Sequence, residues 1–365
     1  MHHTDPTKNS PTIRSCKRIL IATDAWDPPQ VNGVALTYQD TVAQLSLWGD
    51  VLEVIHPRRF KKKWFTIKGD HVEVVRDQGL TAELIEQFEP DHIHIATEGP
   101  IGLAAYRYCR KHSLAFTTTY HTQWPEYVHR RSRGLIPTSW VYPLVRHFHN
   151  GASCMMATTP PMADLLREKQ FNTQIALWMR GVDTARFKPR KPLEYPPALQ
   201  AIKEPIYLYV GRLAKEKNLA PFIQADVEGL KVLVGEGPDE ERLKRLGGKT
   251  LFTGLKRGED LARYYAAADV FVFPSRTDTF GKVLIEALAS GTPIAAFNHM
   301  APAYIIGNSG AGVMDDDLKL AMQSALKIDP KLCLKRAADF STSQATQQFR
   351  DNLVPCQKAT NNGRA

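Results

Sequence analysis

The chain has 365 residues, of which 43% are hydrophobic and 23% are charged, a composition that is typical of a folded globular protein and excludes collagen-like or low-complexity sequence. At roughly 150 residues per domain, this length indicates two domains. Lysine and arginine number 47 against 38 acidic residues, so the formal net charge is +9. An anionic partner is therefore expected: a phosphate ligand, a membrane surface or a nucleic acid.

The sequence shows neither a membrane-spanning segment nor a secretion signal. No apolar run approaches the roughly 18 residues that cross a bilayer. Residues 1–16 are polar and mixed in charge, and we expect them to form a disordered leader. The cysteines are scattered without C-x-x-C spacing, which argues against a disulfide framework or a zinc site. These features predict a cytoplasmic protein.

From residue 17 to residue 186, short strands and amphipathic segments take turns along the chain. This alternation is typical of a parallel sheet covered by helices on both faces, and it predicts one α/β domain. The expected helices are Val34–Trp48 and Gly102–Lys111. The expected strands are Arg18–Thr23, Val51–Ile55, Val72–Val75, Ile93–Ala96, Phe116–Thr119, Ser153–Ala157 and Ile175–Trp178.

Residues 187–204 are rich in proline and are predicted to be a linker. The alternation then resumes over residues 205–331, and residues 332–365 are expected to form a C-terminal helical segment, with helix over Leu332–Leu353. The strands predicted in this half are Ile206–Val210, Leu230–Val234, Thr250–Thr253, Val270–Phe273 and Pro293–Phe297, and its helices are Asp239–Leu246, Glu259–Ala268 and Lys282–Ser290. Two such domains would present their strand-end loops to a shared cleft.

Two strand-end loops of the first domain carry candidate ligand contacts. In Trp26–Val34, Asn32 and Gly33 precede a helix, where backbone amides and the helix dipole favour phosphate. His121 follows a β-branched run, so we expect its imidazole in the cleft, with the aromatic residues Tyr120, Trp124 and Tyr127 available to stack on a sugar. A tight turn and a structural histidine fit the same residues.

Two loops of the second domain have the chemistry of a diphosphate site. In Gly211–Asn218, Arg212 and Lys217 leave one strand end together, which suits a diphosphate clamp or a solvated basic turn. In Pro274–Pro293, the amides of residues 279–281 lie at a predicted helix N-terminus, which again favours anionic oxygen. Asp278 precedes that helix, and Glu286 lies in its second turn.

Pro274–Pro293 resembles the E-x7-E signature of family 4 retaining glycosyltransferases, whose usual text is close to E-G-F-G-x-x-x-x-E-A-x-A-x-G-x-P. Here Asp278 replaces the first glutamate, and Glu286 is the second. The G-R-x-x-x-x-K-N element of the family is intact at Gly211–Asn218. Arg180–Pro189 resembles the family's N-G-V-D-x-x-x-F-x-P, with arginine where asparagine is commoner. The resemblance spans roughly residues 18–350.

The resemblance implies the GT-B fold, an α/β architecture of two Rossmann-like domains that face each other across a cleft. Residues 17–186 would form the acceptor-side domain, and residues 205–331 the domain that binds the nucleotide-sugar. It also implies that the segment 332–365 crosses back to the first domain, and that neither a metal nor another cofactor takes part.

The resemblance further implies roles for individual residues. Arg212 and Lys217 would neutralise the leaving nucleotide diphosphate, Glu286 would hold the ribose, and Asp278 would bind sugar hydroxyls. Aspartate is one methylene shorter than glutamate, which leaves the identity of the donor sugar open. The catalytic residues would be His121, Arg212, Lys217 and Asp278. The donor-binding residues would be Gly33, Arg212, Lys217, Asp278, Thr279, Phe280, Gly281, Val283 and Glu286.

Trp178–Val182 and Thr119–Tyr127 look most like a subgroup of this family. The subgroup contains sulfoquinovosyl- and glucosyl-diacylglycerol synthases and GDP-mannose-dependent mannosyltransferases that act on lipids. The resemblance therefore implies a UDP- or GDP-linked sugar as donor and a membrane lipid, first of all diacylglycerol, as acceptor.

The charge pattern independently favours an acceptor at a membrane. Arg58–Lys68 carries six cations and no acid, interleaved with aromatic residues, and Tyr127–Ala163 holds arginines but no Asp or Glu. Each cation near an anionic leaflet contributes about 1 kcal/mol, and aromatic side chains enter the interface. The predicted acceptor and membrane contacts are Arg58, Arg59, Lys61, Lys62, Lys63, Trp64, Phe65, Trp124, Arg130, Arg131 and Trp140. We expect peripheral attachment to the inner membrane face, although a solvated basic face fits the same charges.

The leading hypothesis is a retaining, metal-independent hexosyltransferase that glycosylates a membrane lipid. The alternatives are a transferase acting on a soluble glycan, a nucleotide-sugar epimerase of the same two-domain fold, and a non-catalytic binder of anionic lipid or nucleic acid. Nucleic acid is disfavoured because no recognised reader motif is present. The sequence leaves the nucleotide, the sugar, the acceptor and the oligomeric state undetermined.

Overall fold

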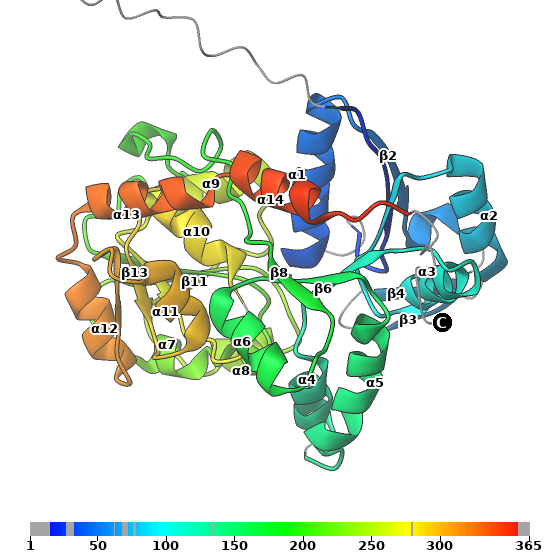
Figure 1. Cartoon of the computed structure of the whole chain (residues 1–365). Helices are drawn as coiled ribbons and strands as arrows, with labels where there is room; N and C mark the ends of the chain where they lie inside the picture. The colour runs from blue at the N-terminus through cyan, green and yellow to red at the C-terminus, as the bar shows by residue number, and fades with distance from the viewer. Residues whose placement is uncertain are drawn as a thin grey trace, which may run out of the picture.

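A computed structural model describes residues 15–26, 33–61, 63–67, 72–75, 78–132, 134–278 and 280–356, and of residues 63–67, 72–74, 78 and 130 the backbone alone. Two α/β units lie side by side, each built around its own six-stranded parallel sheet (Figure 1). The first unit runs from blue to green in the figure, and the second runs from yellow-green to orange. This architecture confirms the predicted fold class of two Rossmann-like domains.

The first sheet has the strand order β2-β1-β5-β6-β7-β8. Its order reverses between β1 and β5, and in open α/β sheets ligands bind outside the carboxyl ends of the strands at such a point. The strands are β1 (Arg18–Ala22), β2 (Val51–Ile55), β5 (His92–Ile95), β6 (Thr117–Tyr120), β7 (Cys154–Ala157) and β8 (Gln174–Leu177). The helices are α1 (Gly33–Leu47), α2 (Gln78–Phe88), α3 (Pro100–Lys111), α4 (Trp124–Arg131), α5 (Thr138–Asn150) and α6 (Pro160–Glu168).

The strand expected at Val72–Val75 is present as β4 but lies outside the parallel sheet. It pairs in antiparallel fashion with β3 (Lys63–Ile67) and forms a separate two-stranded sheet. The physical reason is the short connection: β3 ends at Ile67 and β4 begins at Val72, which is too close for the crossover that two parallel strands need. Strands joined by so few residues pair in antiparallel fashion with each other.

The second sheet has the order β11-β10-β9-β12-β13-β14, with its reversal between β9 and β12. The strands are β9 (Ile206–Val210), β10 (Leu230–Val234), β11 (Thr250–Phe252), β12 (Val270–Phe273), β13 (Ile294–Ala296) and β14 (Gly312–Met314). The helices are α7 (Ala220–Gln224), α8 (Glu240–Lys244), α9 (Gly258–Ala267), α10 (Lys282–Ala289), α11 (Met300–Ile306), α12 (Leu318–Ala325) and α13 (Pro330–Ala337). Residues 187–204 hold a short 3-10 helix, Pro192–Glu194.

The central strand β9 shows why this sheet has an apolar core on both faces. Ile206, Leu208 and Val210 belong to one buried cluster, and the intervening Tyr207 and Tyr209 belong to another. Because side chains alternate between the faces of a strand, a strand that is apolar at every position must be covered on both sides. Helices supply that cover, and they leave the strand ends open for polar loops.

The chain passes between the two domains twice, at the segment after β8 and again after α13. The two passages lie against each other: the Val182 amide donates to the Phe340 carbonyl (2.8 Å), and the Thr342 amide donates to the Val182 carbonyl (3.3 Å). A Cβ on Gly181 would lie 2.5 Å from the Thr342 Cα, so this close approach requires glycine. The final helix, α14 (Thr342–Asn352), then packs on α1 of the first domain (Figure 1).

Arg350 fastens α14 to the first domain. Its guanidinium holds Asp50 with two hydrogen bonds, Nε to Oδ2 at 2.7 Å and Nη2 to Oδ1 at 2.9 Å, and both side chains are buried. Within the described ranges, no helix has the length and apolar character needed to traverse a bilayer.

Candidate active site

The loops that follow β9 and β12 meet at the strand-order reversal of the second sheet. The Lys217 ammonium donates to Asp278 Oδ1 at 2.6 Å, and the Asn218 amide donates to the Pro274 carbonyl at 3.3 Å. Asn218 has the left-handed φ of 54° and ends the short 3-10 helix Lys215–Lys217. The basic loop and the D-T-F-G loop, more than sixty residues apart in sequence, therefore form one site.

Lys217 determines the charge state of Asp278. Burial alone would raise the pKa of this carboxyl, but the Lys217 ammonium beside it holds the pKa below its usual range. The carboxylate is thus ionised near neutral pH, and its Oδ2 is buried without a hydrogen-bond partner. An ionised carboxylate only accepts hydrogen bonds, which suits the hydroxyl groups of a sugar.

Arg212 lies on the same loop as Lys217, with about a third of its side chain exposed (33%) and its guanidinium 3.7 Å from Glu216. The Tyr209 hydroxyl donates to the Arg212 carbonyl at 3.0 Å and so fixes the backbone where the loop leaves β9. A guanidinium on such an anchored loop can turn toward a phosphate with little change in the backbone.

The turn before α10 is shaped by Gly281 and anchored by Phe280. Gly281 has a φ of +77°, a conformation that L side chains rarely adopt. The Phe280 ring is buried against Tyr304 and Phe340. Phe280 and Val283 pack into the core, so any contact they make with a donor comes from their backbone. The predicted site residue Thr279 lies outside the described residues.

Glu286 is buried on α10 and faces Tyr265 of α9, whose hydroxyl donates to Glu286 Oε2 at 2.9 Å. Burial raises the pKa of Glu286, although Lys282 and Tyr265 favour its ionised form. The Tyr265 hydroxyl thus occupies one of the two carboxylate oxygens of Glu286.

Lys282, the first residue of α10, contacts Asp40 of α1 in the other domain. Neither residue was singled out by the sequence, because nothing in the local pattern of α1 indicates which residue faces α10. The ion pair joins the helix that carries Glu286 to the first domain.

On the first-domain side, His121 follows β6 but its ring is buried among protein groups, whereas we expected the imidazole in the cleft. Its Nε2 lies 2.7 Å from the Tyr38 hydroxyl, and its Nδ1 bonds the Arg180 guanidinium. Our expectation that Tyr120 stacks on a sugar is also wrong, because its side chain is 1% exposed and lies in the core. Gly33 begins α1, and among the described residues no atom lies within 4 Å of the place that a Cβ there would take.

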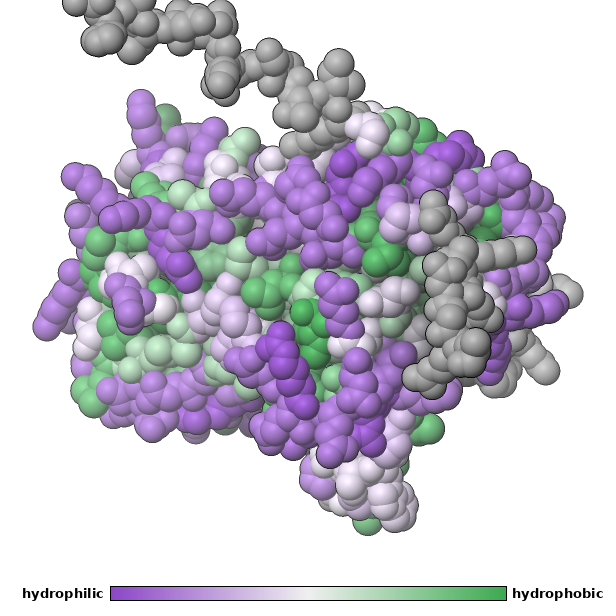
Figure 2. Space-filling model, viewed as in Figure 1, coloured by the Kyte–Doolittle hydropathy of each residue, from purple (hydrophilic) through white to green (hydrophobic). Residues whose placement is uncertain are grey.

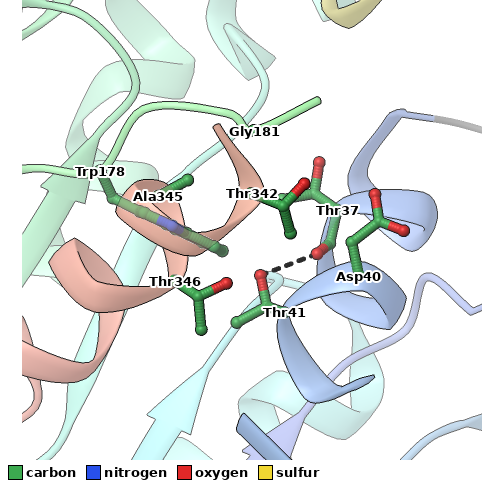
Figure 3. A pocket seen from close by; sticks show the side chains of 8 residues that line it. All are labelled: Thr37, Asp40, Thr41, Trp178, Gly181, Thr342, Ala345 and Thr346. Atoms are coloured by element: carbon green, nitrogen blue, oxygen red, sulfur yellow. Dashed lines mark hydrogen bonds between the residues drawn. The ribbon is translucent and has the colours of Figure 1, made fainter. Parts of the chain in front are cut away.

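A small cavity of about 10 Å³ lies where α1, the segment after β8 and α14 meet (Figure 3). This volume holds at most one water molecule, so the cavity is no donor pocket. Its lining residues are Thr37, Asp40, Thr41, Trp178, Gly181, Thr342, Ala345 and Thr346. Across the described residues, no group of His, Cys, Asp and Glu side chains is placed to hold a metal ion.

The helices α4 and α5 project from the first domain, and Figure 2 shows the end of this projection mostly pale, with some green at its margin. Leu135, Trp140 and Leu144 are strongly exposed there, at 83%, 70% and 73%. Arg131 is exposed beside Tyr127, to whose hydroxyl it donates at 3.0 Å. We name Leu135, Trp140 and Leu144 the apolar tip.

The other predicted membrane contacts are partly engaged within the protein. The Trp124 ring N–H donates to Glu98 at 3.0 Å. Arg59 pairs at 2.9 Å with Glu53, an acid that lies outside the basic run Arg58–Lys68. Phe60 is buried, so it cannot enter a membrane as its place among the cations suggested. Arg58 and Lys61 are exposed. Lys62 and the side chains of Lys63, Trp64, Phe65 and Arg130 lie outside the described residues.

Sequence comparison identifies two family domains in the chain. Residues 25–186 match the family described as Glycosyltransferase Family 4, and residues 194–331 match the family described as Glycosyl transferases group 1. The chain is similar to the sulfoquinovosyl transferase SQD2 of Arabidopsis thaliana, at 30% identity over 58% of this chain and 43% of that protein. It is also similar to the alpha-monoglucosyldiacylglycerol synthase of Streptococcus pneumoniae, at 28% identity over 86% of this chain and 79% of that enzyme.

A GDP-mannose-dependent alpha-mannosyltransferase of Mycobacterium tuberculosis is 32% identical over 62% of this chain and 60% of its own length. The chain thus spans less than two thirds of the plant and mycobacterial relatives. Among solved structures, sucrose-phosphate synthase from Thermosynechococcus elongatus superposes with a TM-score of 0.76 at 21% identity, covering 92% of this chain and 98% of that chain. HepE of Anabaena in complex with UDP-glucose superposes with a TM-score of 0.68 at 15% identity, and the match covers 92% of this chain and 98% of that chain. The chain belongs to the GT-B glycosyltransferases, with a family 4 domain followed by a group 1 domain.

Proposed function

We propose that this protein transfers a sugar from a UDP- or GDP-linked donor to a membrane lipid, first of all diacylglycerol, with retention of anomeric configuration. The observation that carries the proposal is the contact between Lys217 and Asp278, which places a cationic loop against a carboxylate at the strand-order reversal of the second sheet. A leaving diphosphate and a sugar are the two halves of a donor that such a pair would bind.

Charge on the diphosphate is the main change that the protein must stabilise. As the bond to the anomeric carbon breaks, negative charge grows on the departing phosphate oxygens. Lys217, Arg212 and the amides at the start of α10 are the groups available to receive it. Asp278, held ionised by Lys217, would accept hydrogen bonds from the sugar, while Glu286 would take a ribose hydroxyl.

Retention follows from a same-face reaction in this proposal. The acceptor oxygen forms its bond to the anomeric carbon on the side from which the diphosphate leaves, and the acceptor proton passes to a departing phosphate oxygen. The proposal assigns Asp278 to the sugar hydroxyls and Glu286 to the ribose, so it uses no carboxylate as a nucleophile and needs no covalent sugar–enzyme intermediate. The products are the glycosylated lipid and a nucleoside diphosphate.

A lipid acceptor is supported by the names of the relatives and by the apolar tip. The alpha-monoglucosyldiacylglycerol synthase is named for a glycosylated diacylglycerol, SQD2 is named for the transfer of a sulfoquinovosyl group, and the mannosyltransferases are named for a GDP-linked donor. The tip exposes large apolar side chains on the domain that takes the acceptor in this fold, at a position free to enter a bilayer surface.

The test offers the full-length chain a panel of UDP- and GDP-sugars with anionic vesicles that contain diacylglycerol, and scores the mass of the lipid product. We expect one donor to give a glycosyl-diacylglycerol. The variant K217A should lower kcat by about 100-fold or more, as loss of a transition-state charge contact does. K215A is the matched control, because Lys215 lies on the same short helix, is exposed, and has no place in the proposed site.

Each other outcome contradicts a defined part of the proposal. An isomerised free donor would indicate an epimerase, and equal turnover of a soluble glycoside without vesicles would remove the lipid acceptor. Nucleotide release by K217A at the wild-type rate would remove the diphosphate clamp. Salt-sensitive vesicle binding without nucleotide release from any donor would indicate a non-catalytic binder.

A further inference from the structure

Arg180 is a buried cation on the segment between β8 and the second domain. It is 5% exposed, and its guanidinium lies 4.9 Å from the centre of the Trp178 ring. Within the described residues it forms no ion pair with a carboxylate, and its Nη1 is buried without a hydrogen-bond partner. A buried guanidinium without a counter-charge destabilises a fold, so its presence on the inter-domain segment calls for a functional role.

The contact between Arg180 and His121 has a defined direction. Arg180 Nη2 bonds His121 Nδ1. A guanidinium can only donate, so His121 Nδ1 must be the acceptor and carries no proton. The proton of the neutral imidazole is then on Nε2, which donates to the Tyr38 hydroxyl oxygen at 2.7 Å. A second ring proton would face the N–H of Arg180, so this contact excludes the imidazolium form.

The order of donors and acceptors set by Arg180 continues through the core of the first domain. Because Tyr38 accepts from His121, its own hydroxyl proton is free to donate to His94 Nε2, 2.8 Å away. His94 must then carry its proton on Nδ1, and it donates to Thr117 Oγ1 at 2.8 Å. One cation on the inter-domain segment thus orders the protons of a relay that runs from His121 through Tyr38 of α1 to β5 and β6.

Burial and the charges around His121 also favour its neutral form. Burial lowers the pKa of His121 well below its usual value, and Arg180, His94 and His149 lower it further. Burial also lowers the pKa of His94, to about 3. Tyr38 is the other titratable group in contact, and burial raises its pKa. The groups that face His121 from every packed element therefore favour the neutral ring.

We propose that Arg180 is a positioning residue that locks His121 as the neutral Nε2–H tautomer with both ring nitrogens occupied. His121 then takes no part in proton transfer and stays a fixed, uncharged ring that is buried in the first domain. This role rests on the proposed function, together with the catalytic role that the family resemblance implies for His121. It also gives a physical meaning to arginine at a position where the family pattern has asparagine.

The experiment observes the histidine ring nitrogens by NMR in the full-length chain labelled with ¹⁵N-histidine, with H121N used only to identify the His121 signals. In the wild type we expect a single tautomer, with the proton on Nε2, unchanged from pH 5.5 to 8. In R180M, which removes the donor and the charge while keeping the length, His121 should show both tautomers and should titrate. R180K, which keeps a donor and the charge, should restore the Nε2–H form.

Turnover supplies a second readout. We expect R180M to lower kcat by about 10- to 100-fold, as misplacement of a positioning contact does, with a smaller change in the donor KM and a new loss of activity toward acid pH. A wild-type spectrum with the proton on Nδ1 of His121, or with mixed tautomers, would overturn the inference even if transfer activity is found. If NMR shows the single Nε2–H tautomer of His121 but the chain transfers no sugar, the inference about Arg180 holds and the proposed function is wrong.

Discussion

Asp278 and Glu286 are carboxylates on neighbouring segments of one site, yet their surroundings move their pKa values in opposite directions. Both are buried enough to favour the neutral form, but Asp278 has the ammonium of Lys217 within 2.6 Å, and that charge prevails. Glu286 has the uncharged hydroxyl of Tyr265 as its direct partner, and burial prevails. The pair thus offers a firmly ionised acceptor for the sugar and a more easily protonated group for the ribose.

Glu286 gives a pH-dependent prediction for stability. Its pKa is raised in the folded state, so the folded protein binds its proton more tightly than the unfolded chain does. Its contribution to stability is fully present below the unfolded pKa and is lost as the pH rises through the folded pKa. E286Q stays uncharged at every pH and can still accept from Tyr265. Beside Glu286 lie Lys282, Asp40 and Arg186, which the substitution leaves unchanged.

We therefore expect the Tm of E286Q to exceed that of the wild type at pH 7.5 and to approach it at pH 4, measured by differential scanning fluorimetry. Its donor KM should rise by about 10-fold, since a hydrogen bond to a charged group contributes about 1.5–3 kcal/mol. A constant difference in Tm across this pH range would show that the pKa of Glu286 is the same in the folded and the unfolded chain.

At the scale of elements, the helices α4 and α5 carry the apolar tip but have no clear signature in the sequence. Pro143 lies inside α5, and because proline in a helix interior removes a backbone hydrogen bond, the sequence argues against a helix there. Trp140 and Leu144 of α5 are exposed, whereas Val145 and Phe148 are buried. Large apolar side chains on the exposed side make this element a candidate for contact with a second apolar environment.

The element-scale prediction concerns that tip. The double variant W140S/L144S should bind anionic vesicles about 10-fold more weakly or worse in a sedimentation assay, because burying each side chain contributes about 1.5 kcal/mol or more. L193S is the matched control, since Leu193 is 86% exposed on a different element, the short 3-10 helix Pro192–Glu194. Equal loss of binding in the control, or none in the double variant, would mean that the tip does not enter the membrane.

At the scale of the whole molecule, contacts that join the two domains lie close to the proposed site. Lys282 at the start of α10 contacts Asp40 of α1, and the segments at Val182 and Ser341 pair beside them. The bidentate Arg350–Asp50 pair fixes α14 to the first domain. Breaking a buried pair by removal of one partner costs about 3–5 kcal/mol, so this end of the chain is firmly attached.

We predict that Lys282 and Asp40 act as one unit in donor binding. D40N, K282M and the double variant should each raise the donor KM, and the effect of the double variant should be smaller than the product of the single effects, because both substitutions remove the same contact. D226N, which breaks the exposed Lys319–Asp226 pair within the second domain, is the control and should leave the KM unchanged. Independent, multiplicative effects would show that the ion pair does not act as a link between the domains during turnover.

The fold class and the chemistry of the second-domain loops could be predicted from the sequence because both are local. Each of these patterns lies within a short stretch of sequence: the alternation of strands and helices, the run Gly211–Asn218, and the spacing of Asp278 and Glu286. By contrast, the bond from Lys217 to Asp278, the contact of Lys282 with Asp40 and the relay from Arg180 to His121 join residues far apart in the chain. Local sequence patterns carry no information on such pairs, since strand order and the path of the inter-domain segment decide which side chains meet. Burial then decides their charge states, as the opposite pKa shifts of Asp278 and Glu286 show.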